Sequence, residues 1–231
     1  EAMKEGIILE EDEIAQASAY AKEHYDGLTQ EDKDKYHITE ELLRQVYTDN
    51  LLAEKVFEYK TINVDNEVSD YDSRQITVQH ILIYSTDFDS NGNKVPLTAQ
   101  DKNEAYEKVQ SLLATAKETT DFYSLAEANS QASQIEYTFG RGNAPKEYGK
   151  EFEQAAFALK TGQVSNIITT DYGWHIIYCV TDYNEDATIQ AKEDIIEQRR
   201  FDEFGKIFSE WSKNYDVVIN NELWDAISLQ E

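Results

Sequence analysis

Two histidines stand in apolar, β-branched runs of this sequence, and they are its first candidates for chemistry. His80 lies in VQHILI and His175 lies in GWHIIYCV. A single histidine on an apolar strand is most often a core residue whose nitrogens are satisfied. Two in the same setting predict a pair that meets across adjacent strands, where the imidazoles hydrogen-bond each other and fix one tautomer. A hydroxyl such as that of Thr170 would satisfy a remaining nitrogen.

The other residues that could bind or react favour structural roles. The segment DFDSNGN (87–93) resembles the first half of a calcium loop, but its twelfth position is Thr98 instead of glutamate, which favours a turn. Cys179 lies in the apolar run IIYCV, which is typical of a buried, inert thiol. Arg141, between two glycines, is expected to fix its loop through backbone contacts more than to bind a substrate. The sequence therefore predicts no metal and no cofactor.

The composition excludes several classes of function. The chain has 231 residues, 46 acidic against 21 basic, and a net charge of -25. Such a surface repels nucleic acid and anionic lipid, so neither is expected as a partner. A single cysteine excludes internal disulfides, and no apolar run approaches the roughly 20 residues of a membrane helix. The sequence starts at Glu1 without the regions of a secretion signal, so any such segment is expected to be missing from it.

Hydrophobic periodicity divides the chain into helical ends and a mixed middle. A first helix is predicted after the acidic residues 10–13, and a second opens at Thr39. The segment 61–75 loses this periodicity and is expected to be a connection. The order β-α-α-β-α-β then predicts a compact α+β domain of about 100 residues. Its elements are expected near 76–85, 100–117, 121–130, 137–142, 152–161 (a helix closed by Gly162) and 173–180.

A long helix is predicted from about 187 to 214, followed by VVIN and the apolar ELWDAI (222–227). Its apolar stripe, which includes Phe204 and Trp211, needs a partner, and matching apolar faces lie on the N-terminal helices. We therefore expect the two chain ends to pack together around an inserted domain. The predicted parts are an N-terminal helical segment (1–75), an α+β domain (76–183) and a C-terminal helical segment (184–231).

Five pieces of the middle segment, in this order, resemble the parvulin (PpiC, or rotamase) class of peptidyl-prolyl isomerases. They are VQHILI (78–83), DFYSLAEANS (121–130), FGRG (139–142), FEQAAFALKTGQVS (152–165) and DYGWHIIYCV (171–180). With the helical flanks, the chain resembles extracytoplasmic foldases of the PrsA and SurA type, the PrsA-like proteins of Gram-positive bacteria above all. The resemblance implies an α+β fold class, with a parvulin domain of small antiparallel sheet and surrounding helices inserted into an all-α chaperone-like lobe.

The resemblance also implies which residues form the site. His80, Thr170 and His175 match the catalytic histidine pair and its partner hydroxyl. Phe152 matches the aromatic wall of the proline slot, Tyr172 and Tyr137 are expected at its rim, and Ala144 falls near the usual pocket methionine. For all these aromatics plain core packing is the alternative. The implied reaction rotates an X-Pro amide over a barrier of about 18–20 kcal/mol without changing any covalent bond.

The sequence departs from the parvulin pattern in the stretch 129–138. It lacks the usual glycines and places Gln131 and Ala132 near an expected acid or thiol, so weak isomerase activity is expected. The acidic run after HILI argues against a phosphoserine-proline preference. The alternative is a non-catalytic chaperone whose parvulin domain only binds peptide segments.

The resemblance further implies partners and a location. The expected partners are unfolded or partly folded secreted proteins and proline-containing segments, with a homodimer left open. The expected location is extracytoplasmic, at a Gram-positive cell surface, with membrane attachment only through an N-terminal anchor outside this sequence.

Overall fold

The computed structural model describes residues 1–90, 94–216 and 218–221. The chain forms two compact units, one of residues 67–196 and one that joins residues 1–66 to those from 197 onward. We call the first the sheet domain and the second the helical lobe. The predicted fold class is confirmed, because a small antiparallel sheet with its helices is inserted between two chain ends that form one helical unit.

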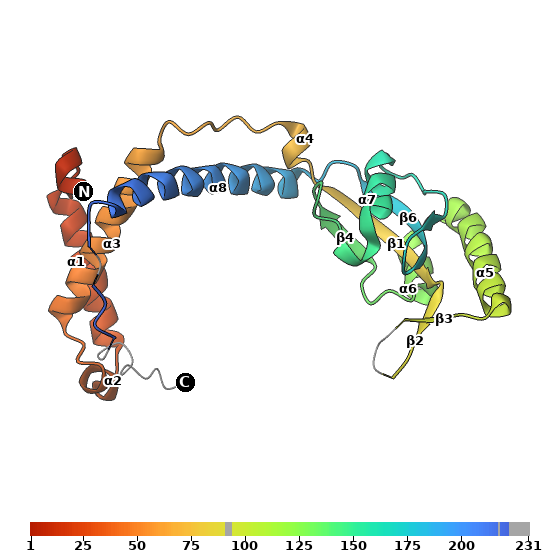
Figure 1. The fold of residues 1–231 in the computed structure, drawn as a ribbon, viewed down its shortest axis with the longest axis horizontal. Helices are drawn as coiled ribbons and strands as arrows, with labels where there is room; N and C mark the ends of the chain where they lie inside the picture. Colours follow the sequence, from red (N-terminus) through yellow and green to blue (C-terminus); the bar gives the residue numbers. More distant parts are fainter. Residues whose placement is uncertain (91–93, 217, 222–231) are drawn as a thin grey trace. The chain divides into compact units, whose positions relative to one another are not determined.

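The sheet domain is built on four antiparallel strands in the order β4-β1-β6-β5 (Figure 1). β1 and β6 form the long central pair. These strands are β1 (Ile76–Tyr84), β4 (Glu136–Phe139), β5 (Ile168–Thr169) and β6 (Gly173–Thr181). A separate hairpin pairs β2 (Thr86–Phe88) with β3 (Lys94–Pro96). The helices of the domain are α4 (Asp70–Ser73), α5 (Ala99–Glu118), α6 (Phe122–Asn129), the 3₁₀ turn η2 (Lys146–Tyr148) and α7 (Gly149–Ala158).

The pleat of the two central strands divides the apolar residues between two cores. Because successive side chains of a strand point to opposite faces, Ile81 and Ile83 pack with Trp174 under α5 and α6. Val78 and Leu82 face the other way and pack with Phe152 of α7 and Ile177. His80 and His175 share this second face by the same alternation. The sheet is thus covered by helices on both faces, and the histidines lie on the side of α7.

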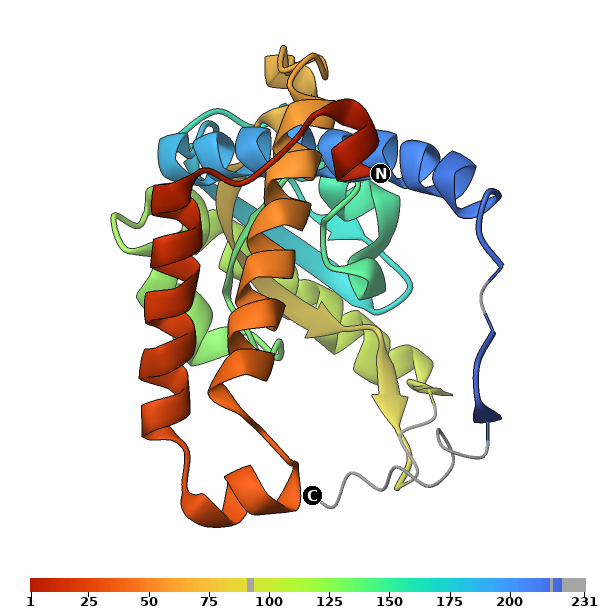
Figure 2. The same ribbon diagram turned by 90° about the vertical axis from the view of Figure 1, so that its left-hand side faces the viewer.

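The helical lobe is formed by elements from both chain ends. α1 and α3 lie side by side (Figure 2), and the predicted start of the second helix at Thr39 is confirmed, since its Oγ1 accepts a hydrogen bond from the N–H of Leu42. The Phe57 ring of α3 contacts those of Phe201 and Phe204 at centroid distances of 5.1 and 5.3 Å. The elements are η1 (Ala2–Glu5), α1 (Glu11–Gly27), α2 (Gln30–Lys35), α3 (Glu40–Thr61) and the C-terminal part of α8 (Glu185–Ser212).

The compact units do not end where the sequence suggested, at 75/76 and 183/184. The sheet domain takes in α4 and the first turns of α8. The reason is a set of polar contacts that join these segments to each other and to the residue that follows β6. Arg74 Nε donates to the carbonyl of Asp182 at 2.6 Å, and Lys192 Nζ lies 2.9 Å from a carboxylate oxygen of Asp70.

One further sequence expectation differs from the structure. The helix expected to be closed by Gly162 ends at Ala158, and Gly162, with φ of 82°, belongs to the turn that follows. The segment 87–93, expected to be a turn, begins in β2, which pairs with β3, and residues 91–93 lie outside the described part of the chain. The apolar run 222–227 also lies outside it. Across the described ranges, no helix is both long and apolar enough to cross a membrane.

Candidate active site

The histidine pair lies between the two central strands, on the α7 side of the sheet. Leu82 of β1 is directly opposite His175 of β6, so His80 is its diagonal neighbour. The two Nδ1 atoms are 3.2 Å apart, and the rings are nearly parallel, with centroids 5.4 Å apart. Both side chains are fully buried. The predicted pairing of the imidazoles is present in the structure.

The partners of the outer nitrogens fix where the protons lie. His80 Nε2 is 3.0 Å from the carbonyl oxygen of Gln134, which only accepts, so Nε2 carries a proton. In a neutral ring Nδ1 of His80 then accepts, and His175 Nδ1 must donate to it. His175 Nε2 in turn accepts from Thr170 Oγ1 at 3.0 Å.

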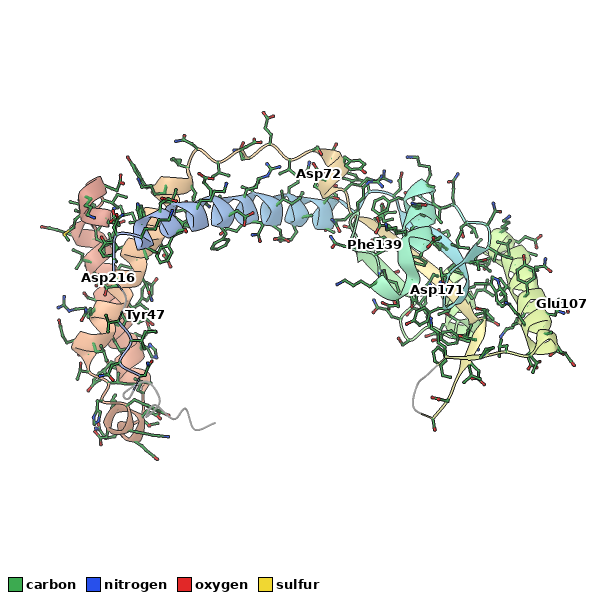
Figure 3. All side chains as sticks on the ribbon, viewed as in Figure 1. Tyr47, Asp72, Glu107, Phe139, Asp171 and Asp216 are labelled. Carbon is green, nitrogen blue, oxygen red and sulfur yellow. The ribbon has the colours of Figure 1, made fainter. Side chains whose placement is uncertain are left out.

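Thr170 Oγ1 also accepts from the backbone N–H of Tyr172, at 3.2 Å. One directed chain of hydrogen bonds therefore runs from Tyr172 N–H through Thr170, His175 and His80 to the carbonyl of Gln134. We call it the histidine chain. The loop between β5 and β6 that holds Thr170 and Tyr172 is marked in Figure 3 by Asp171.

Burial keeps both histidines of the pair neutral. Desolvation lowers the pKa of His80 to about 4, against smaller opposing effects of the Gln134 carbonyl and Glu147. Desolvation, together with the neighbouring His80, lowers the pKa of His175 to about 3. Near pH 7 the pair therefore carries no charge, which agrees with the single tautomer that the hydrogen bonds require.

Aromatic rings enclose the histidines on the side of α7. The Phe152 ring meets His80 at 5.4 Å and His175 at 5.3 Å, both edge-on. Tyr137 of β4 contacts His80 at 5.5 Å, and its half-buried side chain lies at the edge of this group. Tyr172 is also half-buried, and Lys94 Nζ lies 4.0 Å from the centre of its ring. Three residues named from the sequence, His175, Phe152 and Tyr137, thus have rings in contact with His80, and Tyr172 joins this cluster through Tyr148, at a centroid distance of 6.5 Å.

Tyr148 is the residue of this cluster that the sequence interpretation missed. Its ring lies 5.0 Å from His80, 4.8 Å from His175 and 5.1 Å from Phe152. Ala144, named from the sequence as the position near the usual pocket methionine, packs half-buried against the same apolar core, but Tyr148 makes the ring contacts with both histidines. The spacing Tyr148–Phe152 is that of residues on one helical face, and it was the available signal.

Residues 130 and 131, in the stretch that departs from the parvulin pattern, bind the part of β1 that β4 does not pair with. Ser130 Oγ accepts from the N–H of Leu82, and the N–H of Gln131 donates to the Leu82 carbonyl. Gln131 Oε1 accepts from the N–H of Tyr84 at 2.7 Å. The side chain at the position of the expected acid or thiol is therefore a backbone ligand of the strand.

Two residues whose side chains could react or bind a ligand, Cys179 and Arg141, are held by packing contacts that indicate a structural role. Cys179 is buried in β6, where desolvation raises its pKa to about 11 and keeps the thiol protonated. Arg141 stacks its guanidinium on Phe157 at 4.2 Å and on Tyr71 at 4.6 Å, so rings hold it in place of the expected backbone contacts. Among the described residues, no group of three or more His, Cys, Asp or Glu is placed to bind a metal ion.

Comparison with known proteins gives matches to peptidyl-prolyl isomerases and to foldases. Residues 80–181 match the rotamase family, described as the PPIC-type PPIASE domain. The chain is 34% identical over 118 residues to the peptidyl-prolyl cis-trans isomerase Pin1 of Digitalis lanata, covering 46% of this chain and 95% of that protein. It is 30% identical over 172 residues to foldase protein PrsA 3 of Bacillus anthracis, covering 71% of this chain and 54% of that protein.

A solved structure of a PrsA peptidylprolyl isomerase from Bacillus cereus aligns with 92% of this chain and 77% of that chain, with 20% identity and a TM-score of 0.41. The chain spans about half the length of the PrsA relatives that it matches. The PpiC-type match extends from the first histidine of the pair to the last residue of β6, and so contains every residue of the histidine chain. The chain therefore belongs to the parvulin, or PpiC-type, family of peptidyl-prolyl isomerases.

Proposed function

We propose that the sheet domain catalyses the cis-trans isomerisation of X-Pro peptide bonds, with His80, His175 and Thr170 as its catalytic residues. The observation that carries the proposal is the histidine chain under the aromatic cluster of Phe152, Tyr148 and Tyr137. The family membership and the names of the relatives, which include peptidyl-prolyl isomerases and foldases, support the same activity.

The geometry suits a reaction that breaks no bond. Rotation about the C–N bond requires the amide to lose double-bond character, which a polar solvent opposes by stabilising the planar form. Buried rings offer an apolar, water-poor surface, and the neutral imidazoles bring no charge that would retain water. The directed hydrogen bonds hold the rings in one orientation, so the site does not have to reorganise during the rotation.

We further propose that the chain acts as a foldase and that its helical lobe holds unfolded client proteins. Its apolar groove, of about 640 Å³, is lined by residues of the N-terminus, of α3 and of α8, and by Tyr215 just beyond α8. The large apolar side chains among them are Leu52, Val56, Phe204, Phe208, Trp211 and Tyr215. We call this groove the lobe groove. Exposed apolar surface of this kind, set in an acidic protein, binds unfolded segments weakly while charge keeps the complex in solution. The clients are proposed to be secreted proteins, and the location extracytoplasmic at a Gram-positive surface, as the likeness to PrsA foldases suggests.

The deciding experiment measures the cis-trans exchange rate of a short X-Pro peptide by NMR, with the whole chain added. We expect acceleration by the wild-type chain and loss of most of it in His80→Ala and in His175→Ala, because either change breaks the histidine chain. Tyr123→Ala, at an exposed tyrosine of α6, is the matched control and should retain the wild-type rate. An unchanged rate in a folded His80→Ala chain would show that His80 is not a catalytic residue.

The alternative, a non-catalytic chaperone, rests on Gln131. Its side chain accepts a hydrogen bond from the Tyr84 N–H, at the position where the parvulin pattern has an acidic residue or a cysteine. Peptide binding without any acceleration by the wild-type chain would favour that alternative.

A further inference from the structure

The surface assigned to a proline ring is covered in this structure. Phe152, His80 and His175 are each 0% exposed, and Tyr148 above them is 5% exposed. A proline ring that is to touch Phe152 must therefore take the place of another group. The group in contact with all three of these side chains is the phenol ring of Tyr148.

The backbone next to Tyr148 includes one residue with wide conformational freedom, Gly149. Tyr148 ends a three-residue 3₁₀ turn, with Pro145 before it and Gly149 after it. Gly149 has φ of 76° and ψ of -174°, a conformation open to glycine and strained for other residues. The polar anchor of the side chain is weak, because its hydroxyl meets that of Tyr137 at 3.4 Å, near the limit of a hydrogen bond.

We propose that the Tyr148 ring occupies the proline-binding position in the unliganded chain and is displaced by the substrate, with Gly149 as the hinge. Tyr148 is then the residue that sets the affinity of the site for X-Pro segments. This inference rests on the proposed function, since it concerns the slot of the same reaction. The free energy of displacement is subtracted from the binding of every ligand, as in any protein whose binding-competent state is a minor one.

A fixed Tyr148 would give the opposite behaviour. In that arrangement the phenol ring is a permanent wall, a proline ring packs on its outer surface, and removal of the ring weakens binding. The two arrangements therefore differ in the sign of the effect of one substitution.

The test measures the dissociation constant of a blocked Ala-Phe-Pro-Ala peptide by NMR titration of the whole chain. The chain has only four histidines, so ring signals of His80 and His175 report on the site, and those of His24 and His37 in the lobe serve as internal references. We expect Tyr148→Ala to bind the peptide about tenfold more tightly than wild type, equivalent to about 1.4 kcal/mol. Tyr148→Met and Tyr137→Phe should show smaller gains, and Tyr123→Ala none.

The smaller changes also guard against misfolding. If Tyr148→Ala fails to fold by circular dichroism, Tyr148→Met, which leaves a flexible apolar side chain, and Tyr137→Phe, which removes only the hydroxyl anchor, decide the question. Equal or weaker binding in the folded Tyr148 variants, or no binding at all, overturns the proposal. Tighter binding without acceleration of isomerisation in any variant would uphold the displacement and reject the proposed enzymatic function, so the two failures are distinguishable.

Discussion

The backbone N–H of Gln75 donates a hydrogen bond to Thr188 Oγ1 at 3.0 Å, although 113 residues separate them. Thr188 is fully buried, so this contact is shielded from water. Gln75 precedes β1, and Thr188 lies in the first turns of α8. The contact ties the entry and the exit of the inserted domain to each other, and it lies outside the limits 76–183 that the sequence suggested.

We expect a fragment of residues 67–196 to unfold cooperatively and to be more stable than a fragment of 76–183. The shorter piece loses the Gln75–Thr188 and Arg74–Asp182 hydrogen bonds, each worth about 1 kcal/mol. Urea unfolding followed by circular dichroism measures the difference. Equal stability of the two fragments would show that α4 and the start of α8 do not support the sheet, and an unfolded 67–196 would refute the insertion itself.

Thr170→Val should reduce the isomerisation rate without unfolding the chain. Valine nearly preserves the shape of threonine but cannot donate to His175 Nε2, so the tautomers of the pair are no longer fixed from that end. The matched variant Thr170→Ser keeps the hydroxyl and should retain most of the activity. Rates are measured by NMR exchange on a short X-Pro peptide. Equal rates in the valine and serine variants would remove Thr170 from the catalytic set.

The stability of the chain should fall as the pH is lowered from 7.5 to 5.5. The pKa values of His80 and His175 are about 4 and about 3 in the folded chain, below the 6.5 of an exposed histidine. Unfolding therefore takes up protons between these values, and the stabilisation is fully present above pH 6.5 and is lost as the pH falls toward the folded pKa values. The expected slope is on the order of 1–3 kcal/mol per pH unit.

Urea midpoints at several pH values test this slope. The His80→Leu, His175→Leu double variant is the control, because it has no pair to protonate and should show a flatter dependence. An equal slope in wild type and control would assign the pH dependence to other groups.

The lobe should suppress aggregation of a denatured client even when the proline slot is disabled. We expect the Phe152→Ala, His80→Ala double variant to match wild type in light scattering, and Phe208→Asp to be weaker. Phe208 lines the lobe groove and is 59% exposed, so an aspartate there places a charge on the apolar surface. Tyr36→Asp, at an exposed aromatic residue directly after α2 and outside the lining of that groove, is the matched control. Complete loss of suppression in the double variant would locate client binding in the sheet domain.

The parts of the fold that sequence alone predicted are those set by local patterns. β1 and β6 lie where β-branched runs indicated strands, and Thr39 caps α3 as its type and position suggested. The histidine pair was predictable because both residues stand in the same setting, and strand alternation then places them on one face. The spacing of Tyr148 and Phe152 indicates only that they share a helical face. The contacts of Tyr148 with the two histidines depend on how α7 packs against the sheet, which spacing along the chain does not reveal.

Other features were not predicted because they depend on hydrogen bonds between residues that lie far apart in the sequence. The helix that ends at Ala158 was expected to reach Gly162, but the N–H of Gly162 donates to the carbonyl of Cys179 in β6. The domain limits likewise depend on side chains of Arg74 and Thr188 whose partners lie far along the chain. Helix periodicity carries no information about such contacts.

The single direction of the histidine chain restricts how this site can change during evolution. Each inner member donates on one side and accepts on the other, and the two histidines are fully buried. A replacement for His175 must therefore offer both functions at opposite ends of one neutral side chain, which lysine, arginine and carboxylates do not. Reversal of the direction is blocked at the last member, because the carbonyl of Gln134 has no proton to give. A change that removes either function at one histidine then requires a compensating change at the other, so the two histidines are expected to vary together or not at all, whereas serine can replace Thr170 because it keeps the hydroxyl.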